Sequence, residues 1–190
     1  QKSSLLKNLD TSESLSLKNL DFHKKVLAQV QDLSISYDSR PVTEHLSFTV
    51  ERGDRIALVG KNGAGKSSVL KLLLGQDIPH TGHVAVAQGL VISCIPQDTS
   101  YLQGDLREYI ESQGLDESLF KAILRKMDFS REQFSKGMEQ LSAGQKKKVL
   151  LAQSLCQEAH LYLWDEPLNY IDILSRIQIE ELILNCRPTM

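Results

Sequence analysis

One octapeptide constrains this 190-residue chain more than any other feature. Residues 60–67 are Gly-Lys-Asn-Gly-Ala-Gly-Lys-Ser, which fits the pattern G-x-x-x-x-G-K-S without a mismatch. Glycines at these positions let backbone N–H groups approach an anion, because no Cβ holds the main chain away. A helix that starts near Lys66 points its unpaired N–H groups at the same anion. The octapeptide therefore predicts a loop that binds the phosphates of a nucleotide.

The residues on either side of the loop support this prediction. Arg55–Val59 has the composition of a buried parallel strand that leads into the loop, and Ser68–Leu74 has the apolar repeat of a helix that leaves it. The alternative is a glycine-rich turn that carries a surface lysine. In a phosphate-binding loop, the Lys66 ammonium binds the β- and γ-phosphates and the Ser67 hydroxyl is a ligand of Mg²⁺.

Composition limits the class of protein. The length allows one well-packed core, and the hydrophobic (41%) and charged (24%) fractions are ordinary for a globular domain. A net charge of -2 gives no chain-wide basic surface, so a nucleic acid or membrane partner requires a local patch. The sequence has no run of 18 apolar residues and no signal-peptide pattern, so we expect a cytoplasmic chain without a membrane span.

Two sets of potential metal ligands do not predict a metal site. Cys94, Cys156 and Cys186 are odd in number, widely spaced and set in apolar surroundings, which indicates buried reduced thiols. His80 and His83 lack an accompanying cysteine or carboxylate cluster, so we expect a turn between strands there.

The first part of the chain predicts a polar arm and then a pair of strands. Residues 1–25 place leucines between Ser, Lys and Asp, which is typical of the end of a linker that is mobile or docked elsewhere. Val26–Leu33 and Leu46–Val50 alternate apolar and polar residues, as half-exposed antiparallel strands do. Asp38–Pro41 between them has the composition of a turn.

The middle of the chain predicts two more strands and a helical insert. We expect a second strand pair at His83–Val86 and Leu90–Ile95, with Pro96 ending it. Across about residues 98–141, apolar residues recur at helical spacing with charges between them. This indicates two or three short helices inserted as a subdomain.

The last third predicts two helices and a strand. Ser142–Gln145 fits the S-x-x-Q capping box and begins a helix that continues through Leu155. Leu161–Asp165 is an apolar strand, and Ile173–Asn185 has the pattern of a strongly amphipathic helix that stops before Pro188.

Two acids follow the apolar strand. Asp165 and Glu166 lie at its carboxyl end, where ligands bind in open α/β sheets. Asp165 can hold Mg²⁺ through water, and Glu166 can orient or deprotonate a water that attacks a phosphate. Alone, the pair is equally well explained as solvated acids at a strand end. Together with the loop at 60–67 it favours a nucleotide site.

The order of these motifs resembles the ABC-type ATPase domain from about Val26 onward. Residues 60–67 look like the Walker A loop, Gln97 the Q-loop glutamine, Leu141–Gln145 the signature, and Leu161–Glu166 the Walker B strand with its catalytic glutamate. The resemblance implies an α/β P-loop domain with an antiparallel β subdomain and an inserted helical subdomain.

The resemblance also implies the ligands and the site residues. The ligands are ATP and Mg²⁺. Tyr37 would stack on adenine, although a core strand tyrosine is the alternative. Ser142 and Gly144 would complete the site of a second ATPase domain. The set is catalytic Glu166, Lys66 and Gln97; nucleotide-binding Tyr37, Gly60, Asn62, Gly63, Ala64, Gly65, Lys66, Ser67, Ser68, Ser142 and Gly144; and metal-binding Ser67, Gln97 and Asp165.

Residues 166–172, Glu-Pro-Leu-Asn-Tyr-Ile-Asp, resemble the ABC-F family, which has two ATPase domains in one chain and no membrane part. This version is similar to antibiotic-resistance ABC-F proteins that protect the ribosome. It implies that the chain is the second ATPase domain, that residues 1–25 end the interdomain linker, and that the first ATPase domain and ribosomal RNA are partners. The alternative is the ATP-binding subunit of a membrane transporter for drug export.

Some residues depart from the family pattern. Ala143 replaces the usual signature glycine, a change that is tolerated where φ is negative. Arg187–Met190 resembles the start of the strand that carries the switch-loop histidine, so we expect the C-terminal part of the domain to be missing here. Hydrolysis by these residues alone is therefore open.

Lys146–Lys148 begins the signature helix with three positive charges. We interpret it as a solvated first turn, with a ribosomal RNA contact as the alternative. Cations at a helix N-terminus are slightly unfavourable, so neither interpretation explains them.

Overall fold

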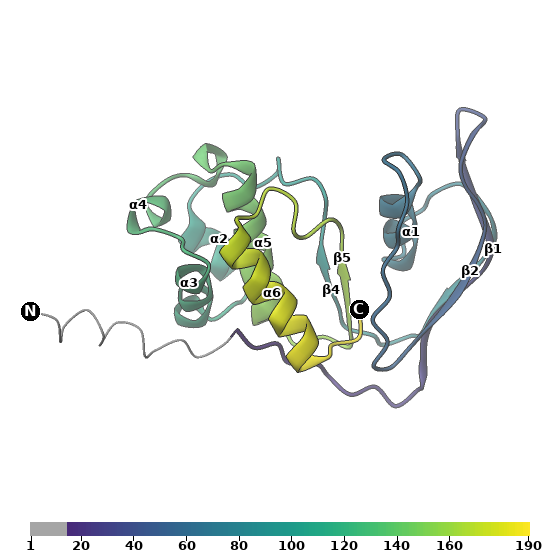
Figure 1. The fold of residues 1–190 in the computed structure, drawn as a ribbon, viewed down its shortest axis with the longest axis horizontal. Helices are drawn as coiled ribbons and strands as arrows, with labels where there is room; N and C mark the ends of the chain where they lie inside the picture. Colours follow the sequence, from purple (N-terminus) through teal and green to yellow (C-terminus); the bar gives the residue numbers. More distant parts are fainter. Residues whose placement is uncertain (1–14) are drawn as a thin grey trace, which may run out of the picture.

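The structure, a computed structural model, describes residues 15–190 (Figure 1). Its elements are β1 (Val26–Tyr37), β2 (Arg40–Glu51), α1 (Lys66–Leu73), β3 (His80–Val86), β4 (Ile92–Ile95), α2 (Leu106–Ser112), α3 (Glu117–Lys126), α4 (Arg131–Phe134), a 3₁₀ turn (Met138–Gln140), α5 (Ala143–Cys156), β5 (Leu161–Trp164) and α6 (Ile173–Cys186). Figure 1 shows α2, α3, α5 and α6 gathered toward one end of the molecule and the β1–β2 hairpin at the other, with α1, β4 and β5 between them.

The predicted antiparallel β subdomain is confirmed. β1 lies at the centre of a sheet with the order β2-β1-β3, and both of its neighbours run antiparallel to it. Asp38 and Ser39 connect β1 to β2, and both have positive φ. Such turns match the twist of the strands that they join. The hairpin carries the end of β1 toward the phosphate-binding loop.

The predicted pairing of the next two strands is wrong. β3 pairs antiparallel with β1, whereas β4 pairs parallel with β5, so the two strands belong to different sheets. His80 and His83 lie within β3 and do not form a turn. The separation follows from packing: Val84 and Val86 of β3 pack against the core under β1, and Ile95 of β4 is buried in the core of the helical region.

The predicted strand at Arg55–Val59 is also wrong. The segment is not part of either sheet, and Val59 is 92% exposed. Residues of this segment and of β5 both line a largely apolar cavity of about 430 Å³. A strand needs a hydrogen-bonded neighbouring strand, and this segment pairs with none among the described residues. The segment bonds instead to Met190, which donates to the Asp54 carbonyl (3.0 Å) and accepts from the Ile56 N–H (2.8 Å).

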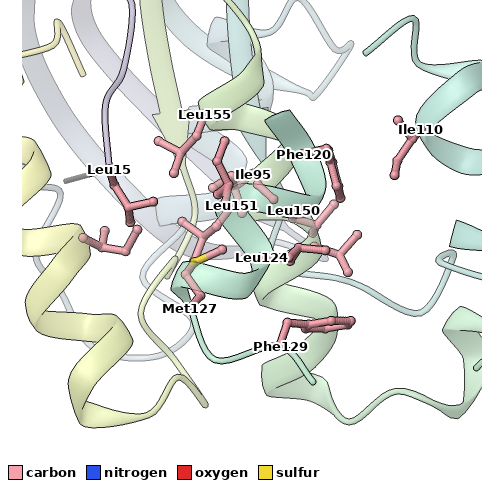
Figure 2. Packing of buried hydrophobic residues seen from close by; sticks show 14 of the residues in the cluster. Leu15, Ile95, Ile110, Phe120, Leu124, Met127, Phe129, Leu150, Leu151 and Leu155 are labelled. Atoms are coloured by element: carbon pink, nitrogen blue, oxygen red, sulfur yellow. The ribbon is translucent and has the colours of Figure 1, made fainter. Parts of the chain in front are cut away.

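The predicted helical insert is confirmed by α2, α3 and α4. Asp105 and Asp116 accept hydrogen bonds from the first backbone N–H groups of α2 and α3, as N-cap residues do. Figure 2 shows side chains of α3 meeting those of α5 around Ile95. The residues that meet are Phe120 and Leu124, one turn apart on α3, and Leu150, Leu151 and Leu155 on α5.

The prediction of an arm that is mobile or docked elsewhere is wrong for residues 15–25, which pack on the domain itself. Leu15 and Leu17 are buried in the core of the helical region, and Leu15 lies beside α6 in Figure 2. The Leu20 N–H donates to the Ala159 carbonyl (2.8 Å), and the Tyr162 hydroxyl donates to the Lys18 carbonyl (2.8 Å). Residues 1–14, including Leu5, Leu6 and Leu9, lie outside the described residues.

Helix α6 begins at Ile173 as predicted and ends at Cys186, one residue later than predicted, but it lacks the predicted amphipathicity. Ile179 and Leu182 are buried, yet apolar residues also occupy the exposed side, namely Ile173, Leu174, Ile177 and Leu184. None of the helices in residues 15–190 combines the length and the apolar composition that a bilayer crossing requires. The three cysteines are free but half-buried, and so are less enclosed than predicted.

A polar junction ties α5 and the end of α3 to the start of α6. The Lys148 ammonium donates to the Met127 carbonyl and forms an ion pair with Asp172, the N-cap of α6. Ser175 donates to the same carbonyl (3.3 Å). Burial alone would raise the pKa of Asp172, but the hydrogen bonds from Lys148 and Ser175 outweigh it and lower this pKa to about 2.

We expect Asp172→Asn to remove a pH-dependent part of the stability. Because the folded pKa lies below the unfolded value of about 3.9, the Asp172 contribution is complete above that value and disappears as the pH falls toward 2. For this half-exposed ion pair we expect about 1 kcal/mol. Urea unfolding of both proteins from pH 6 to pH 2 measures the difference. The exposed Asp77→Asn variant is the control, and a difference that does not change with pH would contradict the prediction.

Candidate nucleotide-binding site

The octapeptide loop has the backbone that its glycines predict. Gly63 and Gly65 have positive φ, and Gly65 is the N-cap of α1, which begins at Lys66. The Lys66 ammonium donates to the carbonyls of Gly60 (2.9 Å) and Lys61 (3.1 Å). The helix N-terminus and this ammonium therefore lie on the same loop, where both can bind an anion.

A cavity of about 300 Å³ opens over the loop. Its lining contains most of the predicted nucleotide-binding residues together with all three of the predicted catalytic ones. The lining residues are Tyr37, Val42, Asn62, Gly63, Ala64, Gly65, Lys66, Ser67, Ser68, Gln97 and Glu166. Gly60, Asp165, Ser142 and Gly144 are predicted site residues that do not line this cavity.

Tyr37 lies at the end of β1 and at the edge of this cavity. Its hydroxyl shares a hydrogen bond of 2.8 Å with Ser68 Oγ, which holds the ring against the start of α1. The residue is 46% exposed, so it is not a core strand tyrosine. A flat exposed ring beside the loop can stack on a base.

A chain of hydrogen bonds links the loop to the strand that carries the acids. Ser67 Oγ donates to Gln97 Oε1 (3.3 Å), and Gln97 Nε2 donates to Glu166 Oε2 (3.2 Å). Asn169 Nδ2 donates to the same Glu166 oxygen (2.7 Å). Sequence reasoning did not include Asn169 in the site, although its place three residues after Glu166 in the Pro-Leu-Asn motif was a signal.

The oxygen donors at this point fit Mg²⁺. Ser67 Oγ and Gln97 Oε1 are hard neutral oxygens within 3.3 Å of each other, beside the Glu166 carboxylate. Asp165 is 7% exposed and lines the neighbouring 430 Å³ cavity, to which Lys66 and Glu166 also contribute. Asp165 is thus adjacent to the other donors, and its role as a metal ligand stays a prediction.

The signature residues lie at the start of α5. The capping box is confirmed: Gln145 N donates to Ser142 Oγ (3.2 Å), and Ser142 N donates to Gln145 Oε1 (2.9 Å). Ala143 does not have positive φ, so its methyl group is accommodated. A Cβ added to Gly144 would lie 2.2 Å from the Tyr170 carbonyl oxygen, so this glycine allows α5 to pack against the loop after β5.

Both interpretations of the lysine run are wrong for two of its residues. Lys147 and Lys148 are 3% and 9% exposed, so they are neither a solvated turn nor free to contact RNA. Each ammonium donates to backbone carbonyls inside the domain. Burial lowers the pKa of Lys147, and the carboxylates of Asp165 and Glu166 act against that shift. Lys146 is half-buried.

Comparison with known sequences places these features among related proteins. The family model described as ABC transporter matches residues 43–169. The chain is 30% identical to the zinc import ATP-binding protein ZnuC of Marinobacter nauticus, over 86% of this chain and 65% of that protein. It is 31% identical to the putative ATP-binding protein YdiF (91% of this chain, 29% of that protein) and 27% identical to the ribosome protection protein VmlR (87% and 31%), both from Bacillus subtilis. The chain therefore spans less than two thirds of the length of these relatives.

Solved structures share the fold. The structure of an ATP-binding subunit of an ABC transporter superposes with a TM-score of 0.68 at 28% identity, covering 85% of this chain and 75% of that one. A bacterial Atm1-family ABC exporter with ATP bound gives a TM-score of 0.71 at 20% identity, covering 99% of this chain and 38% of that one. The predicted α/β architecture with its inserted helical subdomain is thus confirmed.

Proposed function

Because the chain belongs to the ABC transporter family, we propose that residues 26–190 form a domain that binds ATP and hydrolyses it to ADP and phosphate. The observation that carries this proposal is the hydrogen-bond chain from Ser67 through Gln97 to Glu166, which joins the phosphate-binding loop to a carboxylate. A general base within reach of the phosphate site is what hydrolysis requires beyond binding.

Each site residue has a separate role in the proposed reaction. On ATP binding, the Lys66 ammonium gives up its hydrogen bonds to the Gly60 and Lys61 carbonyls and binds phosphate oxygens. Ser67 and Gln97 would hold Mg²⁺, which neutralises charge on the phosphates when bound. Water attacks the γ-phosphorus, the bond to the β–γ bridging oxygen breaks, and the proton of the water goes to Glu166. Gln97 and Asn169 donate to one oxygen of that carboxylate and so orient the other toward the water.

A second ATP-binding domain is part of the proposal. Ser142 and Gly144 lie outside the loop cavity, at the N-terminus of α5. Backbone N–H groups at a helix N-terminus bind anions, so this end of α5 would face the nucleotide of the second domain. ATP then holds the closed pair together, and hydrolysis releases it.

The first candidate function is that of a membrane transporter component. In this setting the domain is a cytoplasmic ATP-binding subunit that works with separate membrane-spanning chains. The support comes from relatives: the zinc import ATP-binding proteins of Marinobacter nauticus and Photobacterium profundum are 30% and 32% identical to this chain, which spans 65% of each. The transported substrate of this protein is a separate question, since the identity lies in the ATP-binding part.

An ABC-F protein that acts on the ribosome, and so confers antibiotic resistance, is the second candidate. The specific observation in its favour is Asn169, the motif residue behind that resemblance, which bonds directly to the Glu166 carboxylate. The similarity to a ribosome protection protein agrees with it. In this setting residues 1–25 would end an interdomain linker, and the partners would be a first ATPase domain and ribosomal RNA.

Cell fractionation separates the two settings. The full-length protein with Glu166→Gln is expected to keep ATP bound. Its lysate is fractionated with ATP and with ADP, and ribosomes are pelleted apart from membranes. Recovery with a membrane protein, released by detergent, supports the transporter. ATP-dependent cosedimentation with detergent-washed ribosomes would overturn it in favour of the second candidate. If the protein stays in the supernatant with ATP and with ADP, bound to neither membranes nor ribosomes, both settings are contradicted. ATP binding would then be tested separately.

A further inference from the structure

Lys147 is a buried charge that the proposed reaction does not use. It lies in the second turn of α5, where its side chain points into the domain and the residue is only 3% exposed. Its ammonium donates to the carbonyls of Pro96 (3.0 Å) and Asp165 (3.3 Å). A buried charge is costly unless hydrogen bonds and opposite charges compensate it, so these contacts need an explanation.

The two carbonyls occupy equivalent places in the sheet. β4 and β5 run parallel with Ile95 opposite Trp164, and the Asp165 N–H donates to the Ile95 carbonyl (2.8 Å). Pro96 and Asp165 are therefore the first residues beyond the same end of the two strands. Each also directly precedes a side chain of the site, Gln97 in one case and Glu166 in the other. One ammonium thus bridges the two backbones that carry the Gln97–Glu166 hydrogen bond.

A small cavity shows how close this bridge is to the proposed base. About 160 Å³ in volume, it is lined by Lys147 together with Gln97, Glu166 and Asn169, and by Ala143 and Tyr170. Lys147 therefore closes the side of the site that faces α5. A neutral donor could bond both carbonyls without burying a charge, so the two hydrogen bonds alone do not explain the charged side chain. The carboxylates of Asp165 and Glu166 are the opposite charges near the ammonium.

We propose that Lys147 is a positioning residue for ATP hydrolysis, which holds the Pro96 and Asp165 backbones so that Gln97 and Glu166 stay in register. This inference rests on the proposed ATPase function. It also links two parts of the domain, because Lys147 is one turn from the signature residues on the same helix. A movement of α5 toward a second domain would shift the ammonium and with it the Gln97–Glu166 pair. Pairing of the domains would thereby set the geometry of the base.

The test compares substitutions of two neighbouring lysines in the full-length protein. Lys147→Met keeps the length of the side chain and removes the ammonium. We expect it to lower kcat about 10- to 100-fold, since a misplacement of catalytic groups by about 1 Å costs up to that much. The KM for ATP and the affinity for a non-hydrolysable ATP analogue should stay within about twofold of wild type, because the phosphate-binding loop is untouched. Lys147→Arg should recover part of kcat, and Lys146→Met should have the same kcat and KM as the wild-type protein.

The outcomes are distinct. If Lys147 only stabilises the fold, its substitution changes thermal stability without a loss of kcat at unchanged KM. That result overturns the inference, and so does an unchanged kcat. If Lys147→Met unfolds at the assay temperature, Lys147→Gln, which keeps a donor but loses the charge and part of the length, is expected to fold and to show a smaller loss of kcat, again with KM unchanged. A wild-type protein that binds ATP without hydrolysing it contradicts the proposed function, whereas a wild-type ATPase insensitive to Lys147 substitution contradicts only the role of Lys147.

Discussion

Replacing Glu166 with glutamine is expected to lower ATP turnover by about 10²- to 10⁴-fold, the usual contribution of a general base, while ATP binding changes little. The amide cannot accept the proton of the attacking water. It can still keep its place, since its carbonyl oxygen can accept the hydrogen bonds that Gln97 (3.2 Å) and Asn169 (2.7 Å) donate to Glu166. Phosphate release in a single turnover, together with titration of a fluorescent ATP analogue, measures the two effects.

A matched carboxylate controls for the loss of charge. Glu44 lies on β2 and is exposed, so Glu44→Gln removes one negative charge away from the cavity and should leave turnover unchanged. If Glu166→Gln retained turnover within about threefold of wild type, Glu166 would not be the base, since a general base typically contributes at least about 10²-fold.

Replacing Gly65 with alanine is expected to abolish ATP binding, with a loss of affinity of at least about 100-fold. A Cβ at this position would lie 2.3 Å from Thr43 Oγ1 and 3.2 Å from Val42 Cγ2, both on β2. Thr43 Oγ1 also donates to the Ala64 carbonyl (2.9 Å), so the loop and the hairpin are packed together. Relief of the clash would displace the loop and the N-terminus of α1, and with them the N–H groups that face the phosphates.

Gly63 provides the control for backbone strain. Its φ of +82° is close to the +75° of Gly65, but an added Cβ would have nothing within 4 Å. Gly63→Ala therefore carries the left-handed strain, about 1–2 kcal/mol or roughly tenfold in affinity, without the clash. Calorimetric titration with ATP and Mg²⁺ compares the variants. Equal losses would show that strain rather than packing governs the loop, and normal binding by Gly65→Ala would contradict this site.

Local sequence patterns determined the parts of the site whose contacts lie close in the chain. Gly63 and Gly65 have positive φ, which few other residues tolerate, and the loop therefore follows from the sequence. Ser142 and Gln145 can bond reciprocally only at a helix start, so the capping box identified the beginning of α5. Asp165 and Glu166 follow an apolar strand whose length and composition were sufficient to place them.

Tertiary structure decided what depends on neighbours far away in the sequence. Apolar alternation indicates that β3 and β4 are strands but does not show which strands they pair with. Tertiary packing determines that they belong to different sheets. Arg55–Val59 has strand composition but pairs with no strand in the described residues, and composition cannot reveal that. The same limit applied to Lys147. A lysine at the start of a helix predicts exposure, and only the meeting of α5 with the ends of β4 and β5 supplies the carbonyls and carboxylates that stabilise its charge inside the domain.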